Sequence, residues 1–190
     1  AKLIAVDHPA DVEVQPTDKL MPPPFPASEV WALRSGRKPI SVLGDDGIDR
    51  TQAVRDGDDV YAPPGVPLPP PYRGMAHPLS ITLDFGPLNH AKPLVLALTG
   101  WLQYGDGSTN IALSQSSAVT IIPPTLEVET AGGAWQPIDI SVGMPAGKTK
   151  TIVCDLAGRL PEGSRRLRLT TTFEIRWDRI ALFERTPLPP

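Results

Sequence analysis

The stretch RLRLTTTFEIRWD, residues 166–178, decides the fold class. Apolar residues, with Thr171 as the one exception, occupy every second position from Leu167 to Trp177, and polar residues stand between them. A period of two is typical of a β-strand with one buried and one solvated face, so we expect one long, uninterrupted strand. Beyond Trp177 the apolar positions shift phase to Ile180 and Leu182. That shift predicts a β-bulge or a sharp bend near Asp178-Arg179.

Working outward, residues 79–85 alternate in the same way and end at Gly86-Pro87. Residues 94–99 are apolar at both odd and even positions, which is typical of a strand covered on both faces. The 24 prolines oppose long helices and favour short strands joined by extended connections. Further short strands are predicted at Leu3–Val6, Val30–Leu33, Ile40–Leu43, Ile111–Leu113, Val119–Ile122, Leu126–Glu129, Trp135–Ile140 and Thr149–Leu156. The sequence therefore predicts an all-β, jelly-roll-like antiparallel β-sandwich with long proline-rich connections.

The chain divides by composition into three parts. Residues 63–71 are mostly proline and predict an extended connector. Residues 72–186 hold the clearest strand patterns and are expected to form the main sandwich, while residues 1–62 are expected to add short strands packed on it. Because Met is not the first residue and no signal-peptide pattern opens the chain, we expect a processed chain or a piece of a larger protein.

Charge and cysteine content exclude several partner classes. The 190 residues carry a net charge of −3 with no basic block, which argues against a nucleic-acid partner. No apolar run approaches the length of a membrane span, so membrane insertion is not expected. The single cysteine, Cys154, lies in a predicted strand and cannot form an internal disulfide. We expect it to be a small buried hydrophobe.

No catalytic motif is present, and we expect neither enzyme activity nor a cofactor. Carboxylates gather in residues 45–49 and 56–59, where tight turns are the expected role and a structural calcium site is the alternative. Glu174 and Asp178 flank Arg176 on the polar side of the long strand. Cross-strand ion pairing on a solvated face is expected for them, in preference to the acid–base pair of a glycoside hydrolase.

Aromatic residues beside amides form the best candidate ligand site. Trp101 and Tyr104 precede the turn at Asp106, and Asn110 and Gln115 follow it. Such a surface could stack on a polar ligand such as a sugar and hydrogen-bond to it. The alternative is that Trp101 simply ends a core strand and caps the sandwich.

Several short motifs follow one another along the chain: Asp7-His8-Pro9, residues 22–26, residues 45–51, Leu83-Asp84-Phe85-Gly86, Leu98-Thr99-Gly100-Trp101, residues 110–115, residues 145–151 and residues 174–180. Taken in order, they resemble the C-terminal β-domain of large bacterial proteins with upstream FG-GAP/ASPIC-UnbV-type or tetratricopeptide regions. The resemblance implies an accessory module of an exported or extracytoplasmic protein, with neighbouring domains as partners and no known activity. The closing strand also resembles the last strand of galactose-binding-like jelly rolls, which is an analogy of fold alone.

Three functions therefore stay open. The leading hypothesis is a non-catalytic accessory module that binds a glycan or another polar ligand. The second is a purely structural cap or spacer that packs on a neighbouring repeat domain. The third is a hydrolase whose site is assembled from distant loops, which would need a concave pocket holding carboxylates or histidines.

Overall fold

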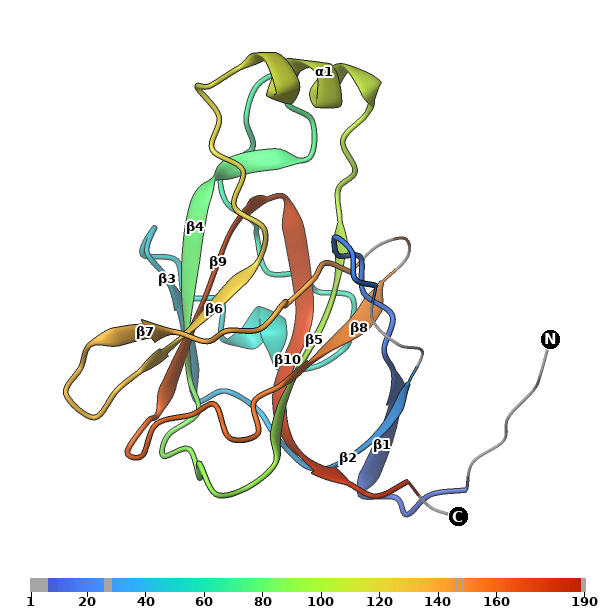
Figure 1. Cartoon of the computed structure of the whole chain (residues 1–190), viewed down its shortest axis with the longest axis vertical. Helices are drawn as coiled ribbons and strands as arrows, with labels where there is room; N and C mark the ends of the chain where they lie inside the picture. Colours follow the sequence, from blue (N-terminus) through green and yellow to red (C-terminus); the bar gives the residue numbers. More distant parts are fainter. Residues whose placement is uncertain (1–6, 26–28, 146, 148, 189–190) are drawn as a thin grey trace.

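The computed structural model describes residues 7–25, 29–145, 147 and 149–188. Over these residues the chain is almost entirely strands and connections, with one short α-helix and one 3-10 turn (Figure 1). The predicted strand at Leu3–Val6 lies outside the described residues. The elements are β1 (Val12–Pro16), β2 (Val30–Arg37), β3 (Ser41–Gly44), η1 (Gln52–Val54), β4 (Met75–Asp84), β5 (Leu94–Leu102), α1 (Gly107–Gln115), β6 (Thr125–Glu129), β7 (Trp135–Pro137), β8 (Lys150–Asp155), β9 (Arg166–Phe173) and β10 (Ile175–Thr186).

The strands form two five-stranded antiparallel sheets, which confirms the all-β sandwich. The first sheet has the order β1-β2-β10-β5-β8, and the second has the order β3-β4-β9-β6-β7. Neighbours in each sheet are mostly distant in sequence, because the chain crosses repeatedly from one sheet to the other. The first part of the chain supplies strands to both sheets, since β2 pairs with β10 and β3 pairs with β4.

The main core lies between the two sheets. Leu96 and Leu98 of β5 are fully buried there, and Leu167 and Leu169 of β9 meet them from the second sheet. These residues occupy alternate positions in their strands, so the period of two in the sequence is the pattern of inward-facing side chains. Trp177 belongs to the same core and is 5% exposed.

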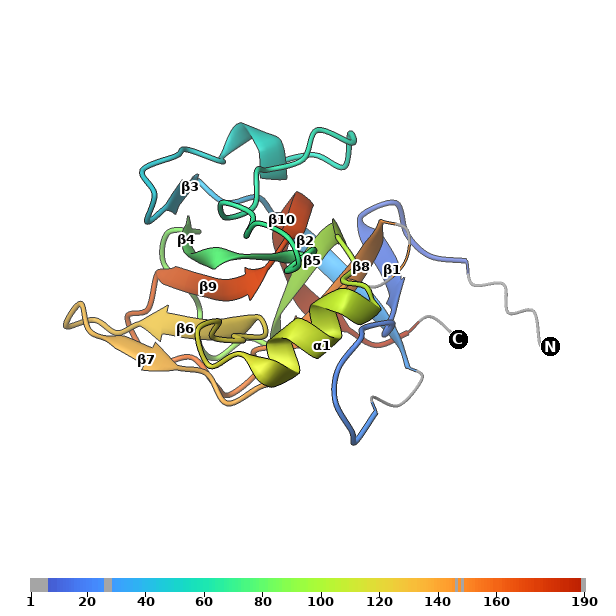
Figure 2. The ribbon, with the colours of Figure 1, turned by 90° about the horizontal axis from the view of Figure 1, so that it is seen from above.

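The first sheet curls, and its other face holds a second, smaller core. Val95 and Ala97 of β5 pack there with Phe183 of β10 and with Trp31 and Leu33 of β2. The curl brings edge strand β1 close to the opposite edge strand β8 (Figure 2). Strand β5 is therefore covered on both faces, as its unbroken apolar run predicts.

The long predicted strand is two strands in different sheets. β9 ends at Phe173 in the second sheet, and β10 begins at Ile175 in the first, so the chain crosses between the sheets at Glu174. The prediction of an uninterrupted strand is wrong, because alternation continues unchanged when a chain passes between two sheets that share one core. The predicted bulge is confirmed, since the β10–β5 register shifts between Trp177 and Arg179.

The proline-rich residues 63–71 run beside the start of β4. The Leu68 amide donates to the Met75 carbonyl (2.9 Å), and the His77 amide donates to the Val66 carbonyl (2.9 Å). Proline keeps this segment extended and limits its backbone donors, so the pairing is short. The segment thereby approaches the end of the sandwich that carries α1.

Helix α1 replaces the strand predicted at Ile111–Leu113, and that prediction is wrong. Asp106 is the N-cap: its carboxylate accepts from the Thr109 amide (3.0 Å), and the Thr109 hydroxyl accepts from the Asp106 amide (3.4 Å). This reciprocal pair starts a helix that the short apolar run, read alone, does not reveal. Residues 119–122, also predicted as a strand, lie instead in the irregular connection between α1 and β6, and that prediction is wrong.

Candidate functional site

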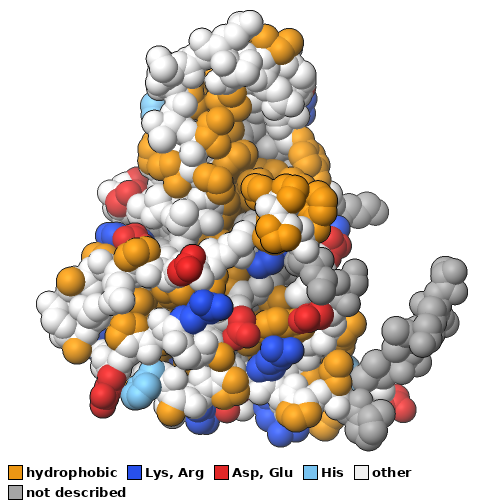
Figure 3. Space-filling model, in the orientation of Figure 1, with side chains coloured by type: hydrophobic (Ala, Val, Ile, Leu, Met, Phe, Trp, Pro, Cys, Tyr) orange, Lys and Arg blue, Asp and Glu red, His pale blue; other side chains and the backbone are white. Residues whose placement is uncertain are grey.

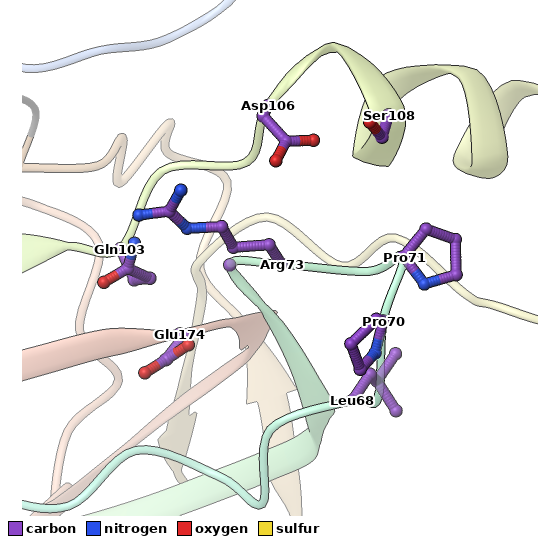
Figure 4. A pocket seen from close by; sticks show the side chains of 9 residues that line it. Leu68, Pro70, Pro71, Arg73, Gln103, Asp106, Ser108 and Glu174 are labelled. Atoms are coloured by element: carbon purple, nitrogen blue, oxygen red, sulfur yellow. The ribbon is translucent and has the colours of Figure 1, made fainter.

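A cavity of about 570 Å³ opens at the end of the sandwich that carries α1 (Figure 4). Three segments meet there: the start of β4, the end of β5 and the crossing between β9 and β10. Their backbones are joined directly, because the Gln103 amide donates to the Glu174 carbonyl and the Glu174 amide donates to the Gly74 carbonyl, each at 2.9 Å. The floor of the cavity is therefore held by the same hydrogen-bonding pattern as the sheets.

One side of the cavity is apolar. Leu68, Pro70 and Pro71 line it from the proline-rich segment. The buried Thr109 of α1 fixes this segment, since its hydroxyl lies 3.0 Å from the Pro71 carbonyl oxygen and 3.2 Å from that of Arg73. The helix and the proline-rich wall are thus positioned by a single side chain.

The other side of the cavity is polar. Arg73, Gln103, Asp106, Ser108 and Glu174 contribute side chains that are labelled in Figure 4. With its amide oxygen turned toward Arg73, Gln103 accepts from Nη2 (3.1 Å) and Nε (3.2 Å) of that guanidinium. The lining of this open cavity therefore combines cationic donors, carboxylate acceptors and an amide.

The two carboxylates of the cavity are both engaged by other groups. Glu174 is 8% exposed, and its Oε1 accepts from the Arg176 guanidinium at 2.8 Å. Asp106 holds the start of α1 through Oδ1, and the hydrogen bond from the Thr109 amide is the largest cause that lowers the pKa of its carboxyl. Both carboxylates therefore act as hydrogen-bond acceptors within the fold.

Trp101, expected to stack on a ligand, lies beside the cavity and does not line it. It pairs in register with Arg176, whose guanidinium carbon sits 5.5 Å from the centre of the indole ring. The ring also makes an edge-to-face contact with Tyr61, at 6.3 Å between centroids. Trp101 is half-buried and lies outside both cores.

The remaining predicted residues are distributed along and before α1. Of the five predicted ligand residues, only Asp106 lines the cavity. Tyr104 is 46% exposed on the connection into α1, and Asn110 and Gln115 are exposed on the helix itself. Sequence reasoning missed Arg73, Gln103 and Ser108, and it considered Glu174 only as an ion-pairing residue or as half of an acid–base pair with Asp178. The only local signal was the capping pattern of Asp106 and Thr109, which would have placed Ser108 in a first helical turn.

Glu174 and Asp178 do not lie on a solvated face, and that expectation is wrong. Asp178 is 3% exposed, and its Oδ1 accepts from the amides of Asp58 (3.2 Å) and Asp59 (3.0 Å). Burial is the main cause that raises the pKa of Asp178. The residue fixes the loop of residues 56–59 onto β10, because a buried carboxylate needs hydrogen-bond donors.

The other acidic run, residues 45–49, forms an ion pair and turn hydrogen bonds within the fold. Asp46 forms a two-pronged pair with the buried Arg50, and Asp49 accepts from the Thr51 amide (2.8 Å). Among the residues that the structure describes, no three His, Cys, Asp or Glu side chains are grouped so as to hold a metal ion. Cys154 is buried as expected, and burial raises the pKa of its thiol to about 11.

Comparison with known proteins yields no match to a protein-family model, to a curated protein or to a solved structure. The resemblance to the C-terminal β-domain of bacterial repeat proteins therefore stays a prediction. In the described part of the chain, no helix is long and apolar enough to cross a membrane.

Proposed function

We propose that the chain is a non-catalytic accessory module of a larger bacterial protein and that it binds a polar ligand, such as a glycan, in the cavity beside α1. The observation that carries the proposal is the composition of this cavity. An apolar wall of Leu68, Pro70 and Pro71 faces a polar wall of donors and acceptors across about 570 Å³. Small-molecule sites commonly combine an apolar lining with a few convergent polar groups.

Sugar chemistry fits both walls. A pyranose presents C–H groups on its ring faces, which pack on proline and leucine, and hydroxyl groups around its rim, which both donate and accept. Arg73 and Gln103 supply donors, whereas Asp106 and Glu174 supply acceptors. The site therefore offers partners of both kinds, as a polyhydroxylated ligand requires.

The predicted ligand residues that do not line the cavity differ in how directly this proposal has them contact the ligand. Trp101 holds Arg176 and thereby the Glu174–Arg176 ion pair, and so acts on the ligand through its neighbours. Tyr104 stands beside Gln103 and meets the ligand at the rim. Asn110 and Gln115 lie further along α1 and would contact only a longer ligand that follows the helix.

A binding role is favoured over hydrolysis by the state of the two carboxylates. Glycoside hydrolases need one carboxylic acid and one carboxylate free to reach the scissile bond. Here Glu174 is held by Arg176, and Asp106 is held by the first turn of α1. An exported location is supported by the sequence resemblance alone.

Filling the cavity tests the proposal. Ser108→Trp places an indole in the cavity, and Ser114→Trp adds the same group on an exposed part of the same helix away from it. A ligand that binds only the folded state raises the melting temperature, so a glycan panel is screened by thermal shift against both variants. The proposal expects a stabilising glycan whose effect is lost in Ser108→Trp and kept in Ser114→Trp. A hit that survives Ser108→Trp, or an entirely flat panel, would contradict it.

A second candidate function, the structural cap, is favoured by the uncharged end of the molecule. Residues 107–126 contain no Asp, Glu, Lys or Arg. Two large apolar side chains in this segment are exposed: Ile111 59% and Ile121 49%. The α1 end shows mostly uncharged side chains, whereas charged groups gather over the opposite half (Figure 3). Such patches commonly mark interfaces.

Hydrogen exchange distinguishes the structural-cap hypothesis from the binding-module hypothesis. Amides of residues 107–122 are measured in this chain alone and in the parent protein with its neighbouring domains. A docked cap predicts protection of these amides only in the parent protein, with β2 amides as the internal control. Equal exchange of residues 107–122 in both samples would argue against the cap.

A further inference from the structure

Charge neutralisation differs among the groups that line the cavity. The Glu174 carboxylate is neutralised by Arg176 at 2.8 Å. The Asp106 carboxylate is committed through Oδ1 to the Thr109 amide and lies at the positive end of α1, which its charge complements. Arg73 differs, because among the residues that the structure describes its guanidinium hydrogen-bonds to the neutral amide oxygen of Gln103 alone.

Arg73 forms no ion pair with any carboxylate in the described part of the chain. Asp106 is near enough to be influenced by Arg73 electrostatically, but the two groups make no contact, since each is held by another partner. Figure 4 shows the guanidinium extended along the cavity between Gln103 and Asp106. Among the described residues that line the cavity, Arg73 is thus a cation with no direct ion-pair partner.

We infer that the cavity selects a glycan that carries a carboxylate, of the uronic-acid type, and that Arg73 is the residue that recognises it. This inference rests on the proposed function and names its ligand class. Arginine is suited to the role, because its planar fork matches a carboxylate and the hydrogen bonds between the two are charge-assisted. The Gln103 amide yields its place on the guanidinium to the ligand, while the apolar wall contacts the sugar ring.

A matched pair of ligands tests this inference by calorimetric titration. The pair consists of a uronic-acid disaccharide and the neutral disaccharide that differs only in having CH₂OH in place of the carboxylate. The acidic sugar is expected to bind at least about tenfold more tightly, as one charge-assisted hydrogen-bonding pair implies. A sulfated disaccharide is the third ligand, and it shows whether any anion suffices.

Variants assign the preference to Arg73. Arg73→Gln is expected to abolish the preference for the acid while leaving the weaker binding of the neutral sugar. Arg34→Gln is the matched control, because it removes the same charge from the exposed side of β2, where Arg34 pairs with Asp11. Arg73→Lys keeps the charge but loses the fork, and should retain only part of the preference.

The outcomes are distinguishable. Equal affinity for the acidic and neutral sugars would overturn the inference and leave the binding module intact. A stronger response to sulfate than to carboxylate would also overturn the carboxylate assignment. If neither sugar binds to the folded wild-type chain, both the inference and the proposed function fail. Circular dichroism of each variant confirms that losses of binding arise in the folded protein.

Discussion

Substituting Asp46 by Asn tests how the loop between β3 and β4 is held. Arg50 is 2% exposed and is the largest of the fully buried side chains. Its guanidinium donates to both Asp46 oxygens at 2.8 and 2.7 Å, to the Pro63 carbonyl at 2.9 Å and to the Ile48 carbonyl at 3.1 Å. Asp46→Asn leaves this buried cation with carbonyl partners alone.

The structure sets the magnitude of the loss. Removing one partner of a fully buried ion pair costs about 3–5 kcal/mol. The cost is smaller here, because the Asp46 side chain is 31% exposed and two carbonyls still hold Arg50. The Arg50 hydrogen bond lowers the pKa of Asp46 from its ordinary value of 3.8 to about 2. Undiscounted, that difference would be worth roughly 2 kcal/mol. Solvent screens this exposed carboxylate, so we expect Asp46→Asn to lower the free energy of unfolding by about 1 kcal/mol.

The pH dependence provides an independent check. The pKa of Asp46 is lower in the folded chain than in the unfolded chain, so its stabilisation is fully present above about pH 4. It is lost as the pH falls toward about 2, the pKa of the folded state. In urea unfolding followed by tryptophan fluorescence, the stability difference between the wild type and Asp46→Asn should be largest at pH 7 and should shrink as the pH falls toward 2.

Asp56→Asn is the matched control, because Asp56 pairs with Lys38 and both side chains are well exposed. Exposed ion pairs contribute little to stability. We therefore expect this variant to unfold at nearly the wild-type urea concentration. If Asp46→Asn were no less stable than Asp56→Asn at pH 7, the reasoning about the buried Arg50 would be refuted.

Three further outcomes are expected, each with its own measurement. Thr109→Val removes the hydroxyl that holds Pro71 and caps α1, and should lower stability in urea by about 1–2 kcal/mol; unchanged stability would argue that the hydroxyl is dispensable. Gly74→Ala should cost about 2 kcal/mol, since Gly74 has φ +82° and an added Cβ would lie 2.5 Å from the Gln103 carbonyl oxygen. Gly107→Ala is its control and should not destabilise the chain, because an added Cβ at Gly107 would meet no atom within 4 Å. Burial raises the pKa of Asp178, so the wild type should gain stability relative to Asp178→Asn as the pH falls through that raised pKa; parallel pH profiles would contradict this.

The secondary structure could be predicted from the sequence wherever buried side chains recurred at a regular spacing. The alternation in β9 and β10 and the bulge after Trp177 were predictable, because inward-facing side chains recur every two residues. The crossing at Glu174 was not, since the apolar phase is the same on both sides of it. Helix α1 was missed because its apolar residues are few and its start depends on the side chains of Asp106 and Thr109.

The candidate site was predicted only in part. Asp106 was found, because a carboxylate next to glycines marks a turn in any fold. Arg73 was not found, because nothing near it in sequence marks a ligand site, and Glu174 was considered only as an ion-pairing residue or as half of an acid–base pair with Asp178. Arg73 and Glu174 share the cavity only through backbone hydrogen bonds that join residues 74, 103 and 174.

The sequence by itself determined the all-β class, the doubly covered β5 and the burial of Trp177 and Cys154, because these follow from the local order of apolar residues. Tertiary structure alone decided which strands became neighbours, the curl of the first sheet and the cavity beside α1. The physical reason is that strand pairing and cavities depend on contacts between distant segments. Periodicity specifies which face of a strand is buried, but it does not specify which strand covers that face.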